Sequence, residues 1–460
     1  MLAAVAAVAS VAAVTSVAAV GPAASAQAAS AGWSRPVRLA SPVRSDVLPA
    51  LVAFSARGTA SIGFSVEDVD APAFSTGYVV QRAPNGKLTR PRALAGAQRL
   101  LSLAYDGGSG ELLTGTSPAG FACCSSAQAV SVDGGRARTL VDNQLAGASD
   151  GRLLGLGRRW LAAMASERGV WVAQSSPGAP FGATTRLSDA AADVVAFDAA
   201  SVGGGETAVA WAASDDGSSP PQFRDIFVAR GSAKSPPRRA SLVITAAPGH
   251  AIDELEVAAG PGERPRPPRP APGKPPAKPR ASTLSPVPTL VWVESWTDPR
   301  GRFRSQVRYA DLGRTVRAHA LSSASELAAG LSVASDASGE EAVSWKACTS
   351  AGSCSVRAAL RGARGGFSAV ARLGSIDPPE TPAVSVSPSG QALLGWIASG
   401  HVFAAAASRG ARGLGAVRLV SKTNYATDLT IAFGPAGKAL AVWTQGTLAQ
   451  AVMGAEYSSG

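Results

Sequence analysis

The chain has 460 residues, 46% of them hydrophobic and 6% aromatic, which is enough apolar material for a sizeable core. Its 50 Gly and 32 Pro favour many turns and argue against long helices. The formal net charge is +11, but residues 260–288 carry about half of it. No basic patch interleaved with aromatic residues occurs elsewhere, so the sequence argues against a nucleic-acid-binding protein.

Residues 1–28 predict an export signal. The run from Met1 to Val20 is almost entirely Ala, Val, Ser and Leu, and Ala26-Gln-Ala28 places small residues at −3 and −1 of a cleavage site. No Lys or Arg precedes the apolar run, so a start codon placed too late or an uncleaved anchor is the alternative. No second run of about 18 apolar residues predicts a membrane span. We therefore expect the chain from residue 29 onward to be secreted, extracellular or associated with the cell wall.

The strongest pattern is a repeat in which a Gly is followed six residues later by an aromatic residue, with small apolar residues between them. Two degenerate copies place Thr116 after Gly110 and Ala163 after Gly157, and one copy before Trp292 has its turn replaced by the Pro-rich residues 260–288. Without that insertion the spacing is about 50 residues throughout. The eight repeat positions are Phe64, Thr116, Ala163, Trp211, Trp292, Trp345, Trp396 and Trp443.

Each repeat contains four short strand-like segments. An apolar run such as Leu51–Phe54 precedes the Gly, the aromatic segment follows it, and a third run such as Ile226–Arg230 comes before a last segment such as Ala416–Leu419. Four-stranded units with this period predict an all-β protein, a β-propeller of about eight blades, with seven as the alternative. The repeated Trp residues are expected to pack between blades rather than to bind a ligand.

The two ends of the chain predict how the ring closes. The last unit stops at Tyr457 after its third strand, and Gly32–Leu39 resembles the fourth-strand segments of other units. We therefore expect the N-terminal strand to complete the last blade and to remove two exposed sheet edges.

Two further features of the sequence are a Pro-rich insertion and four cysteines. The basic Pro-rich insertion, residues 260–288, predicts an extended, disordered segment that could hold an anionic cell-wall polymer by charge. Cys348 and Cys354 flank a turn-like spacer and predict a disulfide, whereas Cys123 and Cys124 could pair with each other or elsewhere. The spacing suggests neither zinc binding nor thioredoxin-like chemistry.

On the Gly-x5-Trp frame and the closing strand, the chain resembles secreted bacterial β-propeller proteins over nearly its whole length after residue 28. Sialidases are the obvious enzymes for comparison, but their repeated turn has its aromatic residue three positions after Gly. The nearest copy here, Ser335–Gly339, does not match that motif, so no sialidase catalytic residue is carried over. The resemblance implies a fold and leaves the function open.

No catalytic motif is visible: G-x-S-x-G, H-E-x-x-H, P-loop and EF-hand patterns are all absent from the sequence. In a propeller, the connections between strands 2 and 3 share one face with the crossings to the next blade. Crossing residues Asp193, Asp253 and Asp428 are expected near the central channel. The residues predicted to bind a ligand on that face are Asp68, Asp70, Asp215, Asp216, Trp296, Asp298 and His401.

These residues suit a carbohydrate, or a hard cation such as calcium, although solvated turn residues give the same pattern. Our main functional hypothesis is therefore a non-enzymatic extracellular binding or scaffold propeller with a carbohydrate or protein ligand, and with no cofactor unless calcium binds. The alternative is a glycan hydrolase or lyase that uses paired carboxylates on the same face.

Overall fold

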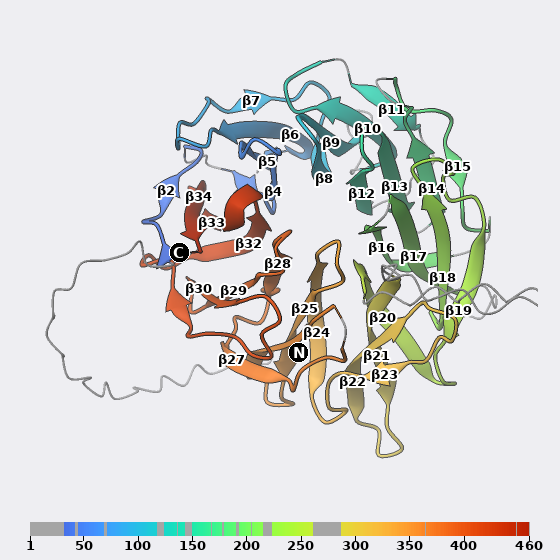
Figure 1. Cartoon of the computed structure of the whole chain (residues 1–460). Helices are drawn as coiled ribbons and strands as arrows, with labels where there is room; N and C mark the ends of the chain where they lie inside the picture. The colour runs from blue at the N-terminus through green and yellow to red at the C-terminus, as the bar shows by residue number, and fades with distance from the viewer. Residues whose placement is uncertain are drawn as a thin grey trace, which may run out of the picture.

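The structure is a computed structural model, which describes residues 32–41, 45–68, 71–116, 124–135, 137–142, 150–166, 168–176, 179–189, 193–203, 205–214, 223–260, 287–363, 365–447 and 449–459. The predicted export signal lies outside these residues, as does all but the base of the Pro-rich insertion. The regular secondary structure of the described chain is almost entirely β-strand, and its strands form eight antiparallel blades around a central axis (Figure 1). The eight-bladed prediction is confirmed.

The two inner strands of each blade carry the repeat. The first strands are β4 (Leu51–Phe54), β8 (Arg99–Asp106), β12 (Asp150–Gly155), β16 (Asp193–Gly203), β20 (His250–Ala259), β24 (Leu327–Ser335), β28 (Ala383–Val386) and β32 (Ala426–Phe433). The second strands are β5 (Ala60–Asp68), β9 (Ser109–Thr116), β13 (Trp160–Ser166), β17 (Glu206–Ser214), β21 (Pro288–Thr297), β25 (Glu341–Cys348), β29 (Ala392–Ala398) and β33 (Lys438–Gln445). In blade 1 the short strand β3 (Asp46–Val47) also pairs with β5.

The outer strands complete the blades. The third strands are β6 (Ala71–Arg82), β10 (Ser126–Ser131), β14 (Gly169–Gln174), β18 (Asp225–Ser232), β22 (Phe303–Asp311), β26 (Cys354–Arg361), β30 (His401–Ala407) and β34 (Ala451–Ser458). The fourth strands of blades 1 to 7 are β7 (Arg92–Ala93), β11 (Arg138–Val141), β15 (Thr185–Arg186), β19 (Ala240–Thr245), β23 (His319–Ala320), β27 (Ala371–Ser375) and β31 (Arg418–Leu419). In blade 8 the position of the fourth strand is filled by strands from the N-terminal end of the chain.

The N-terminal strands β1 (Gly32–Trp33) and β2 (Val37–Arg38) pair antiparallel with β34, so the predicted closure is confirmed. Trp33 packs against Tyr457 with a ring-centroid distance of 5.4 Å. Leu39 is buried, and its N–H donates to the Val452 carbonyl over 2.8 Å. In Figure 1 the blue β2 lies beside the red β34. The first and last segments of the described chain therefore share one sheet.

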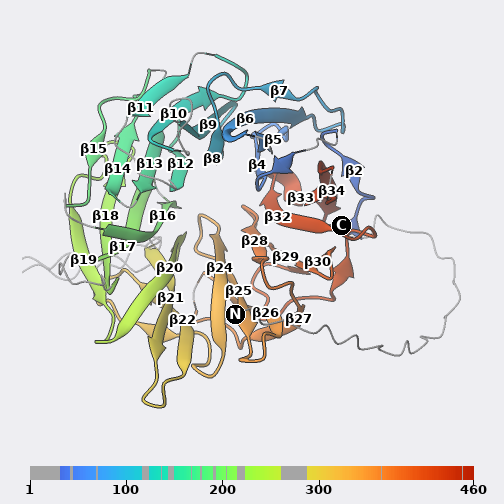
Figure 2. The same ribbon diagram turned by 180° about the vertical axis from the view of Figure 1, so that it is seen from behind.

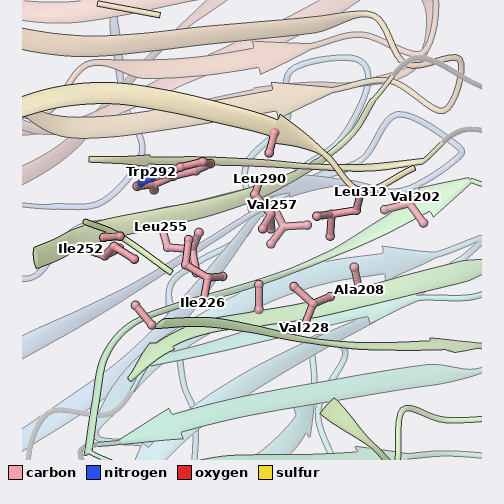
Figure 3. Packing of buried hydrophobic residues seen from close by; sticks show 14 of the residues in the cluster. Val202, Ala208, Ile226, Val228, Ile252, Leu255, Val257, Leu290, Trp292 and Leu312 are labelled. Carbon is pink, nitrogen blue, oxygen red and sulfur yellow. The ribbon is translucent and has the colours of Figure 1, made fainter. Parts of the chain in front are cut away.

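The repeated Trp residues form the core between blades, as predicted. Trp211, Trp292, Trp345, Trp396 and Trp443 are each at most 2% exposed. Each lies in a cluster shared with the preceding blade; Figure 3 shows Trp292 of blade 5 among Ile226 and Val228 of blade 4. Blade packing by these large side chains explains why the Gly-x5-Trp frame is the strongest signal in the sequence.

The repeat positions of the two degenerate copies were assigned wrongly, although Gly157 has the positive φ of 68° expected of a turn glycine. Gly110 lies inside β9, and the positive φ of 62° belongs to Gly107 instead. Thr116 ends β9, and Ala163 packs toward blade 4 rather than blade 2. At the junction of blades 2 and 3 the space is filled by Met164 together with Trp171, which comes from the third strand. The junction of blades 2 and 3 therefore stays packed with hydrophobic side chains although the Gly-x5-aromatic motif is absent there.

The first strand of each blade has one edge that no strand of its own sheet covers. Side chains of neighbouring blades bind N–H groups along this edge. The Ser102 hydroxyl accepts from Leu153 N over 3.0 Å, and the Asp198 carboxylate accepts from Val257 N over 2.7 Å. Glu254 accepts from Gly330 N and Leu331 N, and Ser385 accepts from Phe433 N. These bonds satisfy backbone donors that would otherwise be buried without a partner.

The closing strands supply the first test. A chain that begins at Ser41 lacks β1 and β2, which leaves the edge of β34 open and removes the buried Leu39 side chain. We expect its melting temperature to fall by roughly 5–10 °C or more relative to a chain that begins at Gly32. Differential scanning calorimetry measures this, and equal melting temperatures for the two chains would show that closure adds no stability.

Candidate functional site

The predicted ligand-binding residues fall into two groups. Asp70, Asp215 and Asp216 lie outside the described residues, as does the side chain of Asp68. Asp298 lies in the connection between strands 2 and 3 of blade 5, as expected, whereas Trp296 lies near the end of β21 and His401 begins β30. Their role in binding stays a prediction.

Trp296 belongs to a packed polar cluster on blade 5. Its ring stacks on His250 with centroids 4.7 Å apart and an interplanar angle of 5°. His250 Nδ1 lies 2.6 Å from an oxygen of Glu294, a carboxylate that is only 2% exposed. Glu294 also contacts Arg308 Nη1 at 3.0 Å. Trp296 is half-buried and held by these contacts, so it offers a ligand only part of its ring.

Asp298 and His401 are engaged in their own turns. Asp298 accepts hydrogen bonds from the N–H groups of Arg300 and Arg302 and from the Arg302 and Arg304 guanidinium groups. The bonds from Arg302 contribute most to holding the pKa of Asp298 well below its ordinary value. His401 Nδ1 lies 2.8 Å from the Ser399 carbonyl. The Asp298 carboxylate therefore shapes a tight turn.

The cysteine expectations are partly resolved. Cys348 and Cys354 form a disulfide, as predicted, which joins the ends of β25 and β26. Cys124 is buried and disulfide-bonded. Cys123 lies outside the described residues, so the choice between the two pairings proposed for these adjacent cysteines stays open.

A pocket of about 520 Å³ opens between blades 3 and 4, on the face formed by the 2–3 connections and the crossings between blades. Among the described residues, its polar lining is formed by Asp150, which begins β12, Asp193, which begins β16, and Ser166 at the end of β13. Ala165, the segment Val194–Phe197 and Phe223 supply the rest of the wall. A cavity of this size whose wall combines polar and apolar side chains is compatible with a small-molecule site.

A β-bulge shapes this pocket. The register between β16 and β17 shifts between Val194 and Ala196, which leaves Val195 without a cross-strand partner. Bulges re-aim side chains at sheet edges, and Val195 is 43% exposed in the pocket wall. Asp193 was expected near the channel, and Asp150 was not singled out from the sequence.

Beneath the pocket, Arg152 connects three carboxylates of blades 3, 4 and 5. Its Nη1 lies 3.0 Å from Asp150, its Nε lies 2.6 Å from Asp198, and its Nη2 lies 4.0 Å from Glu256. Burial lowers the pKa of Arg152, but the carboxylates, Asp198 foremost, hold it above its ordinary value. Asp150 belongs to both this network and the pocket, so the two are continuous.

The two deeper carboxylates differ in their contacts. Asp198 is 3% exposed, and its two oxygens bond to Arg152 and to Val257 N. Burial, and then the neighbouring Asp198 carboxylate, raise the pKa of Glu256 well above its ordinary value. Asp198 is therefore committed to structure, whereas Glu256 is a carboxyl group that can hold a proton.

Neither a metal-binding cluster nor a membrane-spanning helix occurs among the described residues. Within the described ranges, no group of three or more His, Cys, Asp or Glu side chains is arranged to hold a metal ion. The same part of the chain contains no helix with the length and apolar character to cross a membrane.

A second buried ionic network lies at the opposite face, between blades 5 and 6. Arg361 contacts Glu341 at 2.5 Å and Asp311 at 3.0 Å, and it donates to the Thr289 hydroxyl over 2.6 Å. Its guanidinium lies 4.5 Å from the centre of the Phe367 ring. Burial raises the pKa of Glu341 to about 7, against the lowering effect of Arg361. This network joins two blades at the base of the Pro-rich insertion, where Gly260 N donates to the Val287 carbonyl.

No protein-family model and no curated protein matches the chain. Among solved structures, the Dos1 propeller is 12% identical and aligns over 93% of this chain and 94% of that chain, with a TM-score of 0.52. An ulvan lyase, a polysaccharide lyase, is 10% identical over 91% and 95%, with a TM-score of 0.45. An α-L-arabinanase of Penicillium chrysogenum complexed with arabinobiose is 7% identical over 92% and 98%, with a TM-score of 0.43. At these identities the similarity concerns the propeller fold alone.

Glu341 predicts a specific pH dependence of stability. Its pKa is higher in the folded chain than in the unfolded chain, so its contribution is fully present below about pH 4.5 and is lost as pH rises through about 7. We expect the free energy of unfolding of the wild type to fall by about 3 kcal/mol relative to Glu341→Gln between pH 4.5 and 8. Denaturant titrations of both proteins measure the difference, and parallel pH profiles would contradict the assignment.

Proposed function

We propose that this chain is a non-enzymatic, extracellular binding propeller that holds an oligosaccharide in the pocket between blades 3 and 4. The observation that carries the proposal is the pocket itself, in which carboxylates stand beside an apolar wall. Asp150 is exposed, with 55% of its side chain accessible, and Asp193 is exposed at the start of β16. Carboxylate oxygens accept hydrogen bonds from sugar hydroxyl groups, while Val195 and Phe223 can pack against the C–H faces of a sugar ring.

Binding without catalysis is supported by the state of the carboxylates. Acid–base cleavage of a glycosidic bond needs two carboxyl groups on either side of the bond. Asp198 cannot take this role, because it is buried and both of its oxygens are bonded. Asp150 already accepts a hydrogen bond from Arg152. The alternative, a glycan hydrolase or lyase, would use Glu256 as the proton donor, since its pKa is raised and a quarter of its side chain is exposed.

Extracellular placement is part of the same proposal. The apolar N-terminal residues and the Cys348–Cys354 disulfide support it, because disulfides persist in oxidising compartments.

The test compares two neighbouring aspartates. Asp193→Asn removes a charge that lines the pocket, and Asp189→Asn removes an exposed charge four residues earlier that does not line it. After a glycan array selects an oligosaccharide, isothermal titration calorimetry should show binding weakened about tenfold or more by Asp193→Asn and unchanged by Asp189→Asn. Equal affinities for the wild type, Asp193→Asn and Asp189→Asn would show that the oligosaccharide does not bind in this pocket.

The same samples separate binding from catalysis. Oligosaccharide incubated with the wild-type chain should remain intact when its reducing ends are measured over a day. Steady release of new ends, lost in Glu256→Gln, would replace the binding proposal with the hydrolase or lyase alternative.

A further inference from the structure

Charge is segregated between the two faces of the ring, which Figures 1 and 2 view from opposite sides. The described connections of the pocket face, between strands 2 and 3 and between blades, carry five basic and six acidic side chains. The described connections of the other face, between strands 1 and 2 and between strands 3 and 4, carry twelve basic and three acidic side chains. We call this second face the basic face; its basic residues are Arg57, Lys87, Arg90, Arg158, Arg159, Lys234, Arg238, Arg239, Arg314, Arg317, Arg409 and Arg412.

The acidic groups of the basic face are mostly turned inward. Asp336 is 6% exposed and accepts hydrogen bonds within its own turn from Ser338 and Glu340 N. Glu340 is 8% exposed and contacts Arg409 and Gly410 N. Asp133 alone among the three is exposed, whereas every basic side chain of the set except Arg159 is exposed. The surface therefore presents cations with few anions to balance them.

The chemistry of this face favours one kind of partner. Ten of its twelve basic residues are Arg, whose guanidinium group binds carboxylate, sulfate or phosphate through two parallel hydrogen bonds. No aromatic side chain is exposed in the connections of this face that the structure describes. Stacking on the bases of a single-stranded nucleic acid uses exposed aromatic residues, so this surface does not favour that partner. Binding here would rest on ionic contacts spread around a ring.

We propose that the basic face binds a linear acidic polysaccharide. The oxyanion groups of such a polymer recur along its length, and a ring of arginines contributed by separate blades can contact several of them at once. This site is on the opposite side of the ring from the oligosaccharide pocket and does not depend on it. It is also distinct from the Pro-rich insertion, because none of the twelve basic residues of the basic face lies in that segment.

The test uses two triple variants with the same loss of charge. Arg238→Gln, Arg239→Gln and Arg412→Gln together neutralise three positions of the basic face, and Arg168→Gln, Arg300→Gln and Lys422→Gln neutralise three on the pocket face. Heparin is the probe, at 0.15 M NaCl. We expect the wild type and the pocket-face triple to bind heparin with the same affinity within about twofold, and the basic-face triple to bind roughly tenfold or more weakly.

Each other outcome overturns the proposal. Equal weakening of both triples would mean that net charge alone drives binding, and absence of wild-type binding would mean that the face holds no such polymer. If deletion of residues 261–286 abolishes binding while the basic-face triple has no effect, the insertion is the site. If duplex DNA of matched charge displaces heparin at lower concentration than heparin displaces itself, the partner is a nucleic acid.

Discussion

The open edge of the eight innermost strands is the constraint on which the rest of the structure depends. Each first strand pairs on one side only, so its remaining N–H groups face the channel or the next blade. Side chains of adjacent blades accept several of these hydrogen bonds, as Asp198 does from Val257 and Glu254 does from Gly330 and Leu331. An unsatisfied buried donor costs about 1–3 kcal/mol, so these acceptors stabilise the ring in addition to the Trp residues between its blades.

This constraint also decides which polar residues remain for a ligand. The carboxylates of Asp198 and Glu256 help to hold blades 3, 4 and 5 together through their contacts with Arg152. Asp150 and Asp193 begin β12 and β16, at the ends of these strands on the pocket face, and they line the pocket. On the opposite face Glu341 and Glu340 are buried and contact Arg361 and Arg409, so most of the exposed charge in the connections there is basic. Because buried polar groups near the inner strands need partners, the pocket face keeps exposed carboxylates while the opposite face exposes mainly basic side chains.

The fold could be predicted from the sequence because its main packing residues repeat. A Trp at a fixed place on the second strand and a turn Gly before it recur at a constant interval, and the chain ends supply complementary halves of one blade. Blade 3 departs from the repeat because Met164 and Trp171, on its second and third strands, fill the space that a Trp of the second strand fills elsewhere. The site was harder to predict, because a bulge at Val195 and contacts between blades place Asp150 beside Arg152 and His250 beside Glu294. The asymmetry of charge is not apparent from the sequence, because connections that alternate along the chain lie on opposite faces of the ring.

A crystal structure of the chain from residue 29, grown with the oligosaccharide that binds most tightly, tests the central claim most directly. The account predicts sugar density in the pocket between blades 3 and 4, with hydroxyl groups within hydrogen-bond distance of Asp150 or Asp193 and a ring face against Val195 or Phe223. Density elsewhere on the ring, with this pocket filled only by water, would contradict it.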